Sequence, residues 1–233
     1  MLIFDKIGLK FFFQKLRNNH DLNTIRQIFI KEEYNFKKKY NKQIREFYNN
    51  ILKENKIPII IDCGSNIGAS SNYFNIKFPK SKIIAIEPDT ESIKIFKYNV
   101  NESNILLYEN ALSSEVFSYD LDRDGQDWRS TKIKKNIHNN QSQKTITISS
   151  ILEKYDNLIY KPFLIKIDIE GHEKELFKKN YHWIKEFKII IIELHDWLFP
   201  KDEISNNFFL AISNMKKKIL KDGENTIVIN KDI

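Results

Sequence analysis

Carboxylate and imidazole side chains recur at the ends of short apolar segments in this chain. Asp62 ends the segment IIID, Glu87 ends IIAIE, and Asp168 and Glu170 follow FLIKI. Carboxylates in such positions can orient a substrate, take the proton of a hydroxyl group or bind a divalent cation. His195 follows a further apolar segment, IIIIEL, and is a candidate general base because imidazole titrates near neutral pH. A simpler interpretation of His195, a polar residue at the rim of a cleft, stays open.

A glycine-bounded turn, DCGSNIG at residues 62–68, joins the first apolar segment to a helical pattern. Gly64 allows the backbone to turn sharply and to approach a ligand closely, and Gly68 allows close contact between the helix and the strand. Asp62 can accept hydrogen bonds from an ammonium group or a backbone amide. The turn lacks the Gly-x-Gly-x-x-Gly spacing of dinucleotide loops and the Gly-Lys-Ser/Thr of phosphate loops, so the sequence disfavours both kinds of site.

Glu87 gives this turn a chemical partner. It ends the next apolar segment about 20 residues further on, where an acidic residue can bind both hydroxyl groups of a ribose. Pro88 then ends the strand. After the third apolar segment, Asn110 and Ala111 lie in a loop. In nucleotide-binding parallel sheets this loop borders the adenine ring, and the Asn110 side chain could form a hydrogen bond with the edge of that ring. The alternatives are a purely structural turn and a solvated glutamate.

The apolar segments predict the sheet that positions these residues. Continuous apolar runs are typical of strands buried on both faces of a parallel sheet, and ligands bind at the carboxyl ends of such strands. A hairpin at the C-terminus is predicted by two strand-like segments that flank Asp222-Gly223. The predicted strands are 58–62, 82–87, 105–109, 163–169, 187–194, 217–221 and 226–230, and the predicted helices are 68–78, 90–101, 149–155 and 172–179.

Residues 1–56 differ from the rest of the chain in charge and pattern. They hold 13 Lys/Arg and 6 Asp/Glu, whereas residues 57–233 hold 25 of each. Helical spacing of apolar residues predicts two or three amphipathic helices that pack on the main domain and cover a sheet face or the mouth of the cofactor site. The stripes are Ile7, Phe11, Phe12 and Leu16; Ile25, Ile28 and Phe29; and Ile44, Phe47, Ile51 and Leu52.

This basic extension favours an anionic partner or a solvated helical face. Alternating aromatic and basic residues at 6–17 suit contact with a membrane surface. An acidic glycan or nucleic acid is an alternative partner. The polar stretch 120–144 predicts a mobile substrate loop in which Trp128 and Arg129 shape the acceptor pocket. The basic residues at 132–138 lack interleaved aromatic residues, so no nucleic acid is expected.

The cysteine content indicates a reducing compartment. The single cysteine, Cys63, excludes an intrachain disulfide and a cysteine-based zinc site. We expect a cytoplasmic protein, with peripheral contact at the inner membrane face as an alternative, and Cys63 as a small core residue. No apolar run is long enough for a membrane-spanning helix, and the first residues lack the features of a signal peptide.

The motifs DCGSNIG, EP, NALSS, LIKIDIEGHE and IIELH, in this order, resemble those of the FkbM family of methyltransferases. The resemblance covers roughly residues 58–198. It implies a class I methyltransferase fold, which is a mostly parallel Rossmann-like sheet with an antiparallel C-terminal hairpin, here preceded by the 1–56 extension. It also implies that S-adenosylmethionine is the cofactor and that residues 57–233 form the methyltransferase domain.

The resemblance implies residue roles as well. Cofactor contacts would come from the glycine turn and from the ends of the first four predicted strands. The acceptor site would lie at the ends of the fourth and fifth predicted strands. The cofactor set is Asp62, Gly64, Asn66, Gly68, Glu87, Pro88, Asn110, Ala111 and Asp168, and the acceptor set is Asp168, Glu170, Glu173 and His195.

The acceptor itself is less well defined by the sequence. The family implies methylation of hydroxyl groups, mostly on sugars and natural products, so we expect a sugar in a glycan or glycoconjugate. Lipid, natural-product and RNA methylation, a nucleotide-sugar or NAD enzyme, and a non-catalytic binding domain are the alternatives. Metal dependence and homo-oligomerisation are left open.

Overall fold

The computed structural model describes residues 2–4, 11–13, 15–35, 38–123, 131–135, 143–197 and 203–233. A seven-stranded sheet forms its centre, in the order β11-β12-β10-β9-β3-β4-β5. Six of these strands point in the same direction, whereas β12 is antiparallel to both of its neighbours, β10 and β11. The strands are β3 (Ile57–Cys63), β4 (Lys82–Ile86), β5 (Ile105–Tyr108), β9 (Tyr160–Ile167), β10 (Ile189–Glu193), β11 (Lys217–Asp222) and β12 (Asn225–Asn230).

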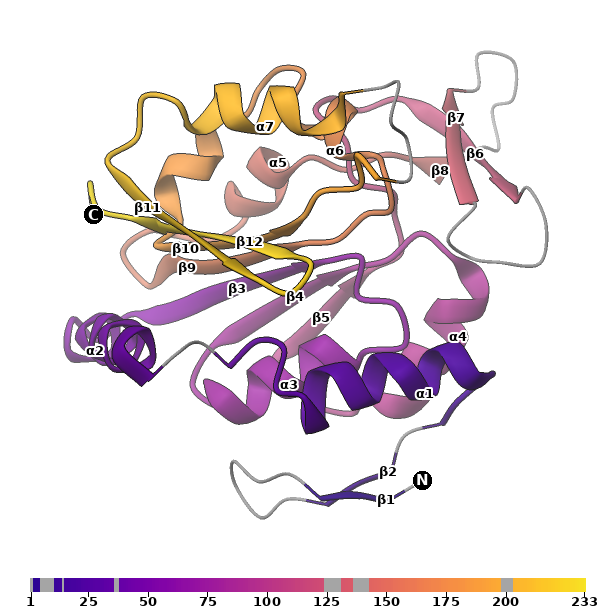
Figure 1. Cartoon of the computed structure of the whole chain (residues 1–233), viewed down its shortest axis with the longest axis horizontal. Coiled ribbons are helices and arrows are strands. Elements are labelled where there is room, and N and C mark those ends of the chain that lie inside the picture. Colours follow the sequence, from indigo (N-terminus) through magenta and orange to yellow (C-terminus); the bar gives the residue numbers. More distant parts are fainter. Residues whose placement is uncertain are drawn as a thin grey trace.

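Helices cover both faces of the sheet (Figure 1). On one face lie α1 (Asn19–Ile25), the π-helix η1 (Arg26–Ile30), α2 (Lys38–Lys53), α3 (Ala69–Lys77) and α4 (Thr90–Asn99). On the other lie α5 (Ile148–Leu152), α6 (Glu173–Leu176), the 3-10 helix η3 (His182–Glu186) and α7 (Ile204–Ile212). The predicted parallel sheet with an antiparallel C-terminal hairpin is thus confirmed. The sequence did not predict η3 or α7.

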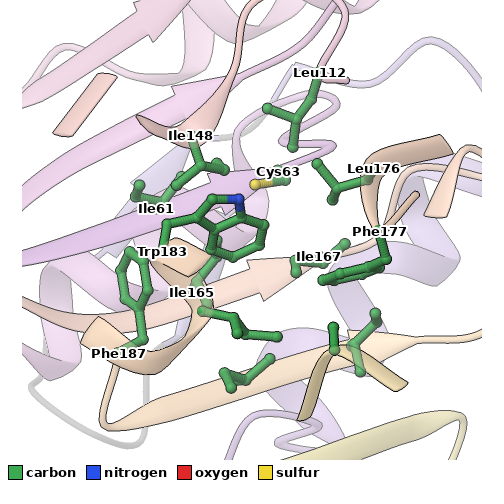
Figure 2. Packing of buried hydrophobic residues seen from close by; sticks show 14 of the residues in the cluster. Ile61, Cys63, Leu112, Ile148, Ile165, Ile167, Leu176, Phe177, Trp183 and Phe187 are labelled. Atoms are coloured by element: carbon green, nitrogen blue, oxygen red, sulfur yellow. The ribbon is translucent and has the colours of Figure 1, made fainter. Parts of the chain in front are cut away.

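The core on the α5–α7 face packs around Trp183 of η3 (Figure 2). Ile61, Ile165 and Ile167 reach it from the strands, and Leu176 comes from α6. Cys63 belongs to this cluster and is fully buried, and burial raises the pKa of its thiol well above the usual value. The prediction that the cysteine is a small core residue is therefore confirmed.

The N-terminal helices share the second core, on the opposite face of the sheet. Ile25 of α1, Phe29 of η1 and Ile51 of α2 are buried in one cluster with Ile60 of β3 and Phe163 of β9. This confirms the prediction that helices of the 1–56 segment pack on the main domain. Truncation of a buried aliphatic side chain such as Ile51 to alanine would lower the free energy of unfolding by about 2–5 kcal/mol.

The start of the chain is not the helix predicted from the stripe at residues 7–16. Two strands, β1 (Leu2–Phe4) and β2 (Phe11–Phe13), pair antiparallel there. Aromatic and branched apolar residues favour strands, and three apolar residues in a row fit both periodicities. Half of the membrane-contact segment 6–17, residues 6–10 and 14, lies outside the described residues. In the described part of the chain, no helix has the length and apolar character needed to cross a membrane.

The stretch 120–144, predicted to be a loop, contains strands. The strands β6 (Ser118–Arg123), β7 (Thr131–Lys135) and β8 (Gln143–Lys144) form a small sheet in the order β7-β6-β8. Alternating apolar residues on β6, Tyr119 and Leu121, give it one apolar side, and Tyr119 is buried. The residues between these strands, including Trp128 and Arg129, lie outside the described part.

Candidate functional site

A cavity of about 350 Å³ opens at the carboxyl ends of β3, β4, β9 and β10. The strand order changes direction at β3, because β4 lies on one side of it and β9 on the other. Ligands bind at such a topological switch point. The volume lies within the range of ligand pockets, about 300–1,000 Å³. The N-terminal helices contribute His20, Asn23, Thr24, Gln27 and Ile28 to its lining, and the small sheet contributes Leu121 and Ile133.

The glycine turn forms the wall of the cavity after β3. Gly64 has a φ of +77°, and a Cβ atom there would lie 1.7 Å from the backbone oxygen of Asp168. The amides of Gly64 and Ser65 both donate to the carbonyl of Ile86. Ser65 lines the cavity, and its hydroxyl is buried and has no hydrogen-bond partner among the described residues. The turn therefore brings bare backbone and one unsatisfied hydroxyl to the cavity surface.

Glu87 is held at the end of β4 by backbone donors. Its two carboxylate oxygens accept the amides of Asn66, at 2.8 Å, and of Asp89, at 2.9 Å. Burial raises the pKa of Glu87 to about 7. Ile86, Pro88 and Glu87 all line the cavity, as the sequence predicted for the end of this strand.

Arg17, which precedes α1, connects the N-terminal segment to this end of the cavity through hydrogen bonds. Its guanidinium donates to the Asn66 side-chain oxygen at 2.7 Å and to the Ser92 hydroxyl at 2.8 Å. A two-point bond to Asp21 fixes the guanidinium, and Asp21 is buried. Arg17 was not predicted as a site residue, and no local pattern could have revealed contacts with residues 49 and 75 positions away.

Asp62 and Lys166 form a buried pair beneath the turn. They are neighbours in the register of β3 and β9, with the Lys166 ammonium 3.4 Å from Asp62 and 3.3 Å from Asp168. The ammonium also donates to the Gly64 carbonyl at 2.8 Å. Burial disfavours the charged lysine, but Asp168 and Asp62 outweigh it and raise the pKa of Lys166. The lysine inside the apolar run FLIKI indicates such a buried pair, but the pair was not predicted from the sequence.

A cluster of carboxylates surrounds His195 at the other end of the cavity. The ring Nδ1 lies 2.9 Å from Oε1 of Glu173, which is fully buried. The ring Nε2 lies 3.5 Å from Glu170, 3.5 Å from Glu193 and 3.9 Å from Asp168. Three of the residues predicted to form the acceptor site, Asp168, Glu170 and His195, therefore line one wall, with Glu193 beside them.

The electrostatics of this cluster differ from what the sequence suggested. Burial opposes protonation of His195, but the hydrogen bond to Glu173 and the charges of the surrounding carboxylates outweigh it and raise the pKa of His195 to about 9. Burial and the charge of Asp168 raise the pKa values of Glu170 and Glu193. The near-neutral pKa expected for His195 is therefore wrong, because the sequence could not show how many carboxylates face its ring.

Several predicted cofactor residues lie near the cavity without lining it. The Asp62 carboxylate is buried and accepts bonds from the hydroxyls of Ser70 and Ser71 on α3. The Asn110 side chain donates to the Lys144 carbonyl, and the Ala111 amide donates to the hydroxyl of Tyr119. Gly68 precedes α3 with a φ of +87°. Direct contacts from Asp62, Gly68, Asn110 and Ala111 to a cofactor stay predictions, whereas Leu112 does line the cavity.

The two ends of the cavity suit two different ligands. At the β4 end, a carboxylate with fixed oxygens lies beside apolar Ile86 and Leu112, which fits a ribose and a flat base. The exposed backbone at Gly64 and the unsatisfied Ser65 hydroxyl offer polar partners along the middle. At the β9–β10 end, the carboxylates and His195 can bind hydroxyl groups, and the carboxylates can accept a proton. An S-adenosylmethionine molecule therefore fits the residues of this cavity.

Comparison with known proteins agrees with this geometry. The chain is 25% identical over 146 residues to the hexuronic acid methyltransferase AglP of Haloferax volcanii, an alignment that covers 62% of this chain and 59% of the relative. The chain thus matches about three fifths of the length of that relative.

Two solved structures are similar in outline at low identity. A putative caffeoyl-CoA O-methyltransferase from Staphylococcus aureus is 12% identical, with 93% of each chain covered and a TM-score of 0.47. An O-methyltransferase from Bacillus cereus in complex with SAH is also 12% identical, with 92% of this chain and 91% of that chain covered and a TM-score of 0.44. The fold assignment rests on the strand order and directions.

The profile described as the methyltransferase FkbM domain matches residues 62–218, which is most of the chain and includes the turn, Glu87 and the His195 cluster. The protein therefore belongs to the FkbM family of S-adenosylmethionine-dependent methyltransferases.

Proposed function

We propose that this enzyme methylates a hydroxyl group of a sugar in a glycan or glycoconjugate. The observation that carries the proposal is the continuity of the cavity, which joins the ribose-type site at Glu87 to the carboxylate cluster at His195. The likeness to a protein named as a hexuronic acid methyltransferase supports a sugar acceptor. Hydroxyl-rich molecules suit a wall of carboxylates, since each ionised carboxylate only accepts hydrogen bonds and each hydroxyl can donate one.

The cofactor end would be held by residues of the turn and of β4. S-adenosylmethionine, when bound, supplies a methyl group activated by a positively charged sulfonium. Glu87 would accept hydrogen bonds from both ribose hydroxyls, and Leu112 would contact the base. The backbone at Gly64 and the Ser65 hydroxyl would bind the amino-acid part, with Lys166 holding the Gly64 carbonyl in place. Asn66 would fix the loop through Arg17 and Glu87.

The acceptor end would align the hydroxyl oxygen and take its proton. Asp168, Glu170 and His195 are the residues we assign to this task, since all three line the cavity at the ends of β9 and β10. Glu173 would position the His195 ring from behind. Alignment of the two reacting groups contributes most in such a transfer, and a carboxylate within hydrogen-bond reach is sufficient for the proton.

The first test is cofactor choice followed by acceptor choice. We expect S-adenosylhomocysteine to raise the thermal midpoint of the purified protein and NAD to leave it unchanged. We then expect transfer of labelled methyl from S-adenosylmethionine to members of a sugar and glycan panel, with lipids and RNA as comparison acceptors. Stabilisation by NAD alone would contradict the methyltransferase interpretation. Transfer of the methyl group to lipid or RNA alone would contradict the proposal that the acceptor is a sugar.

Glu87 gives a pH-dependent prediction for cofactor binding. Ribose hydroxyls bind its charged form. Burial raises the pKa of Glu87 to about 7, although the hydrogen bonds from the backbone amides of Asp89 and Asn66 lower it. Binding should therefore release a proton, and S-adenosylhomocysteine affinity should rise by about tenfold per pH unit up to pH 7 and then level off. We expect Glu87→Gln to weaken binding by about tenfold or more at pH 8 and to flatten this slope.

Calorimetric titrations between pH 5.5 and 8.5 measure both effects. The matched control is Glu91→Gln, since Glu91 is exposed on α4 and pairs only with Lys94 among the ion pairs of the described residues. The control should keep both the affinity and the slope of the wild type. A slope that survives in Glu87→Gln would contradict the role assigned to Glu87.

A further inference from the structure

The carboxylate cluster contains a set of atoms arranged as metal ligands. One ligand atom each from Asp168, Glu193 and His195 lies within 4.8 Å of the other two. The sheet register brings them together, because Ile167 and Ile192 are paired on β9 and β10 and the two acidic residues follow at the next position. All three side chains line the cavity, so a solute can reach them.

The hydrogen bonds of Glu173 settle which nitrogen of His195 donates to Glu173 and which one faces the other carboxylates. Oε1 of Glu173 lies 3.3 Å from the amide of Ile169 and 3.3 Å from that of Gly171, so it acts as an acceptor. Nδ1 of His195 must therefore donate its N–H to the same oxygen. A histidine that donates one nitrogen to a carboxylate and presents the other is the usual arrangement behind a metal ion.

The second nitrogen of His195, Nε2, forms no hydrogen bond with the described residues. The side chain is 2% exposed, and Nε2 faces oxygens of Glu170, Glu193 and Asp168 at 3.5, 3.5 and 3.9 Å. A bare lone pair facing three carboxylates is repulsive, so the space between them requires a positive charge. That charge is a second proton on the ring, a proton held by Glu170 or Glu193, whose pKa values are raised, or a cation bound by the ring and the carboxylates.

The charge on this end of the cavity favours a cation with more than one unit of charge. Glu33 and Glu224 line the cavity together with the carboxylates of the cluster. The buried Lys166 ammonium is directed toward Asp62 and the Gly64 carbonyl as well as toward Asp168. One proton on His195 therefore leaves a large excess of negative charge in a buried place, where it is costly.

We propose that Asp168, Glu193 and His195 bind one divalent transition-metal ion of the Mn²⁺ type. Ligands about 2.1 Å from an octahedral ion lie about 3 to 4.2 Å from one another. The separations of His195 Nε2 from Asp168, 3.9 Å, and from Glu193, 3.5 Å, fall in that range, and all three ligand atoms lie within 4.8 Å of one another. An imidazole among carboxylates favours Mn²⁺ over Mg²⁺ and Ca²⁺, which prefer oxygen ligands throughout. The site follows from these side chains alone, whereas its use in holding the acceptor hydroxyl rests on the proposed function.

The test is a Mn²⁺ titration of the full chain after treatment with EDTA and buffer exchange. The electron paramagnetic resonance signal of free Mn²⁺ reports binding without any measurement of activity. We expect one saturable site per chain, with Mg²⁺ as a weaker competitor. Glu193→Gln and Asp168→Asn should each raise the Mn²⁺ dissociation constant by at least about tenfold, and Glu173→Gln, which only positions the ring, by about 10- to 100-fold.

The control and the fold check decide between the outcomes. Glu175→Gln changes a partly exposed glutamate of α6 that pairs with Lys178, and it should leave Mn²⁺ binding within about twofold. Circular dichroism and S-adenosylhomocysteine binding verify that each variant is folded. Absence of saturable binding, or binding unchanged in Glu193→Gln and Asp168→Asn, overturns the metal site and assigns the charge to a proton on His195, Glu170 or Glu193.

The failure of this inference is distinguishable from failure of the proposed function. Methyl transfer to a sugar in EDTA, without Mn²⁺ binding, would overturn the metal site and leave the proposed function standing. Saturable Mn²⁺ binding in a protein that does not bind S-adenosylhomocysteine would do the reverse.

Discussion

Replacing Gly64 by alanine should abolish S-adenosylhomocysteine binding and lower the free energy of unfolding by several kcal/mol. The added Cβ would lie 1.7 Å from the backbone oxygen and 2.9 Å from the carbonyl carbon of Asp168. Both contacts are with backbone, so no side-chain rotation relieves them, and β3 and β9 must separate where the cavity begins. The positive φ of 77° adds the usual cost for an L-residue, about 1–2 kcal/mol.

Gly223→Ala is the matched control for this experiment. Gly223 also has a positive φ, of 57°, but a Cβ there meets nothing within 4 Å. The control should therefore show the conformational cost alone, and Gly64→Ala should lose about 1–3 kcal/mol more because of overpacking. Thermal unfolding followed by circular dichroism gives the difference, at about 2–4 °C per kcal/mol for a chain of this size. Equal midpoints for the two variants would contradict the close contact at Gly64.

The sheet could be predicted from the sequence because its strands are nearly pure apolar runs. In β10 the four isoleucines at 189–192 are fully or almost fully buried, as expected for a strand covered on both faces. The Asp222-Gly223 turn similarly predicted the β11–β12 hairpin. Apolar patterning failed at β2, where Phe11–Phe13 is too short to distinguish a strand from a helix. It also missed β6, because the stretch 120–144 is polar as a whole, although Tyr119 and Leu121 alternate with Asp120 and Asp122 as in a half-buried strand.

The candidate site was predicted where its residues follow strands and missed where they reach it across the fold. Glu87, Asp168 and His195 could be placed because the carboxyl ends of parallel strands share one edge. Arg17 could not be placed, since its bonds to Asn66 and Ser92 depend on how α1 lies over the turn.

Environment was harder to predict than position. The sequence shows that His195 follows β10, but only the structure shows four carboxylates within 4 Å of its ring. The same holds for Asp62, which the motif suggested as a cofactor ligand and which lies beneath the turn with Lys166. A motif specifies residue types and spacing, whereas burial and charge come from segments distant in the sequence.

Replacing His195 by alanine should lower turnover by about 10²–10⁴-fold while S-adenosylhomocysteine binds with nearly unchanged affinity. The two effects separate because Glu87 and the Gly64 turn hold the cofactor end, whereas His195 lies among the carboxylates at the acceptor end. Initial rates with labelled S-adenosylmethionine and the acceptor identified on the sugar panel measure turnover, and calorimetry measures cofactor binding. His182→Ala is the matched control, because His182 is exposed on η3 and contacts the Tyr181 ring.

The pH and metal dependence of His195 variants then separate the two explanations of its effect. If the ring binds a cation, His195→Gln should retain part of the activity and recover more at high Mn²⁺ concentration, since an amide oxygen can also act as a ligand. If the ring acts through its own proton, activity of the wild type should fall as the pH rises through about 9, where the imidazole loses that proton, and added Mn²⁺ should not rescue His195→Gln. Loss of S-adenosylhomocysteine binding in His195→Ala would contradict both explanations, because it would place His195 at the cofactor end of the cavity.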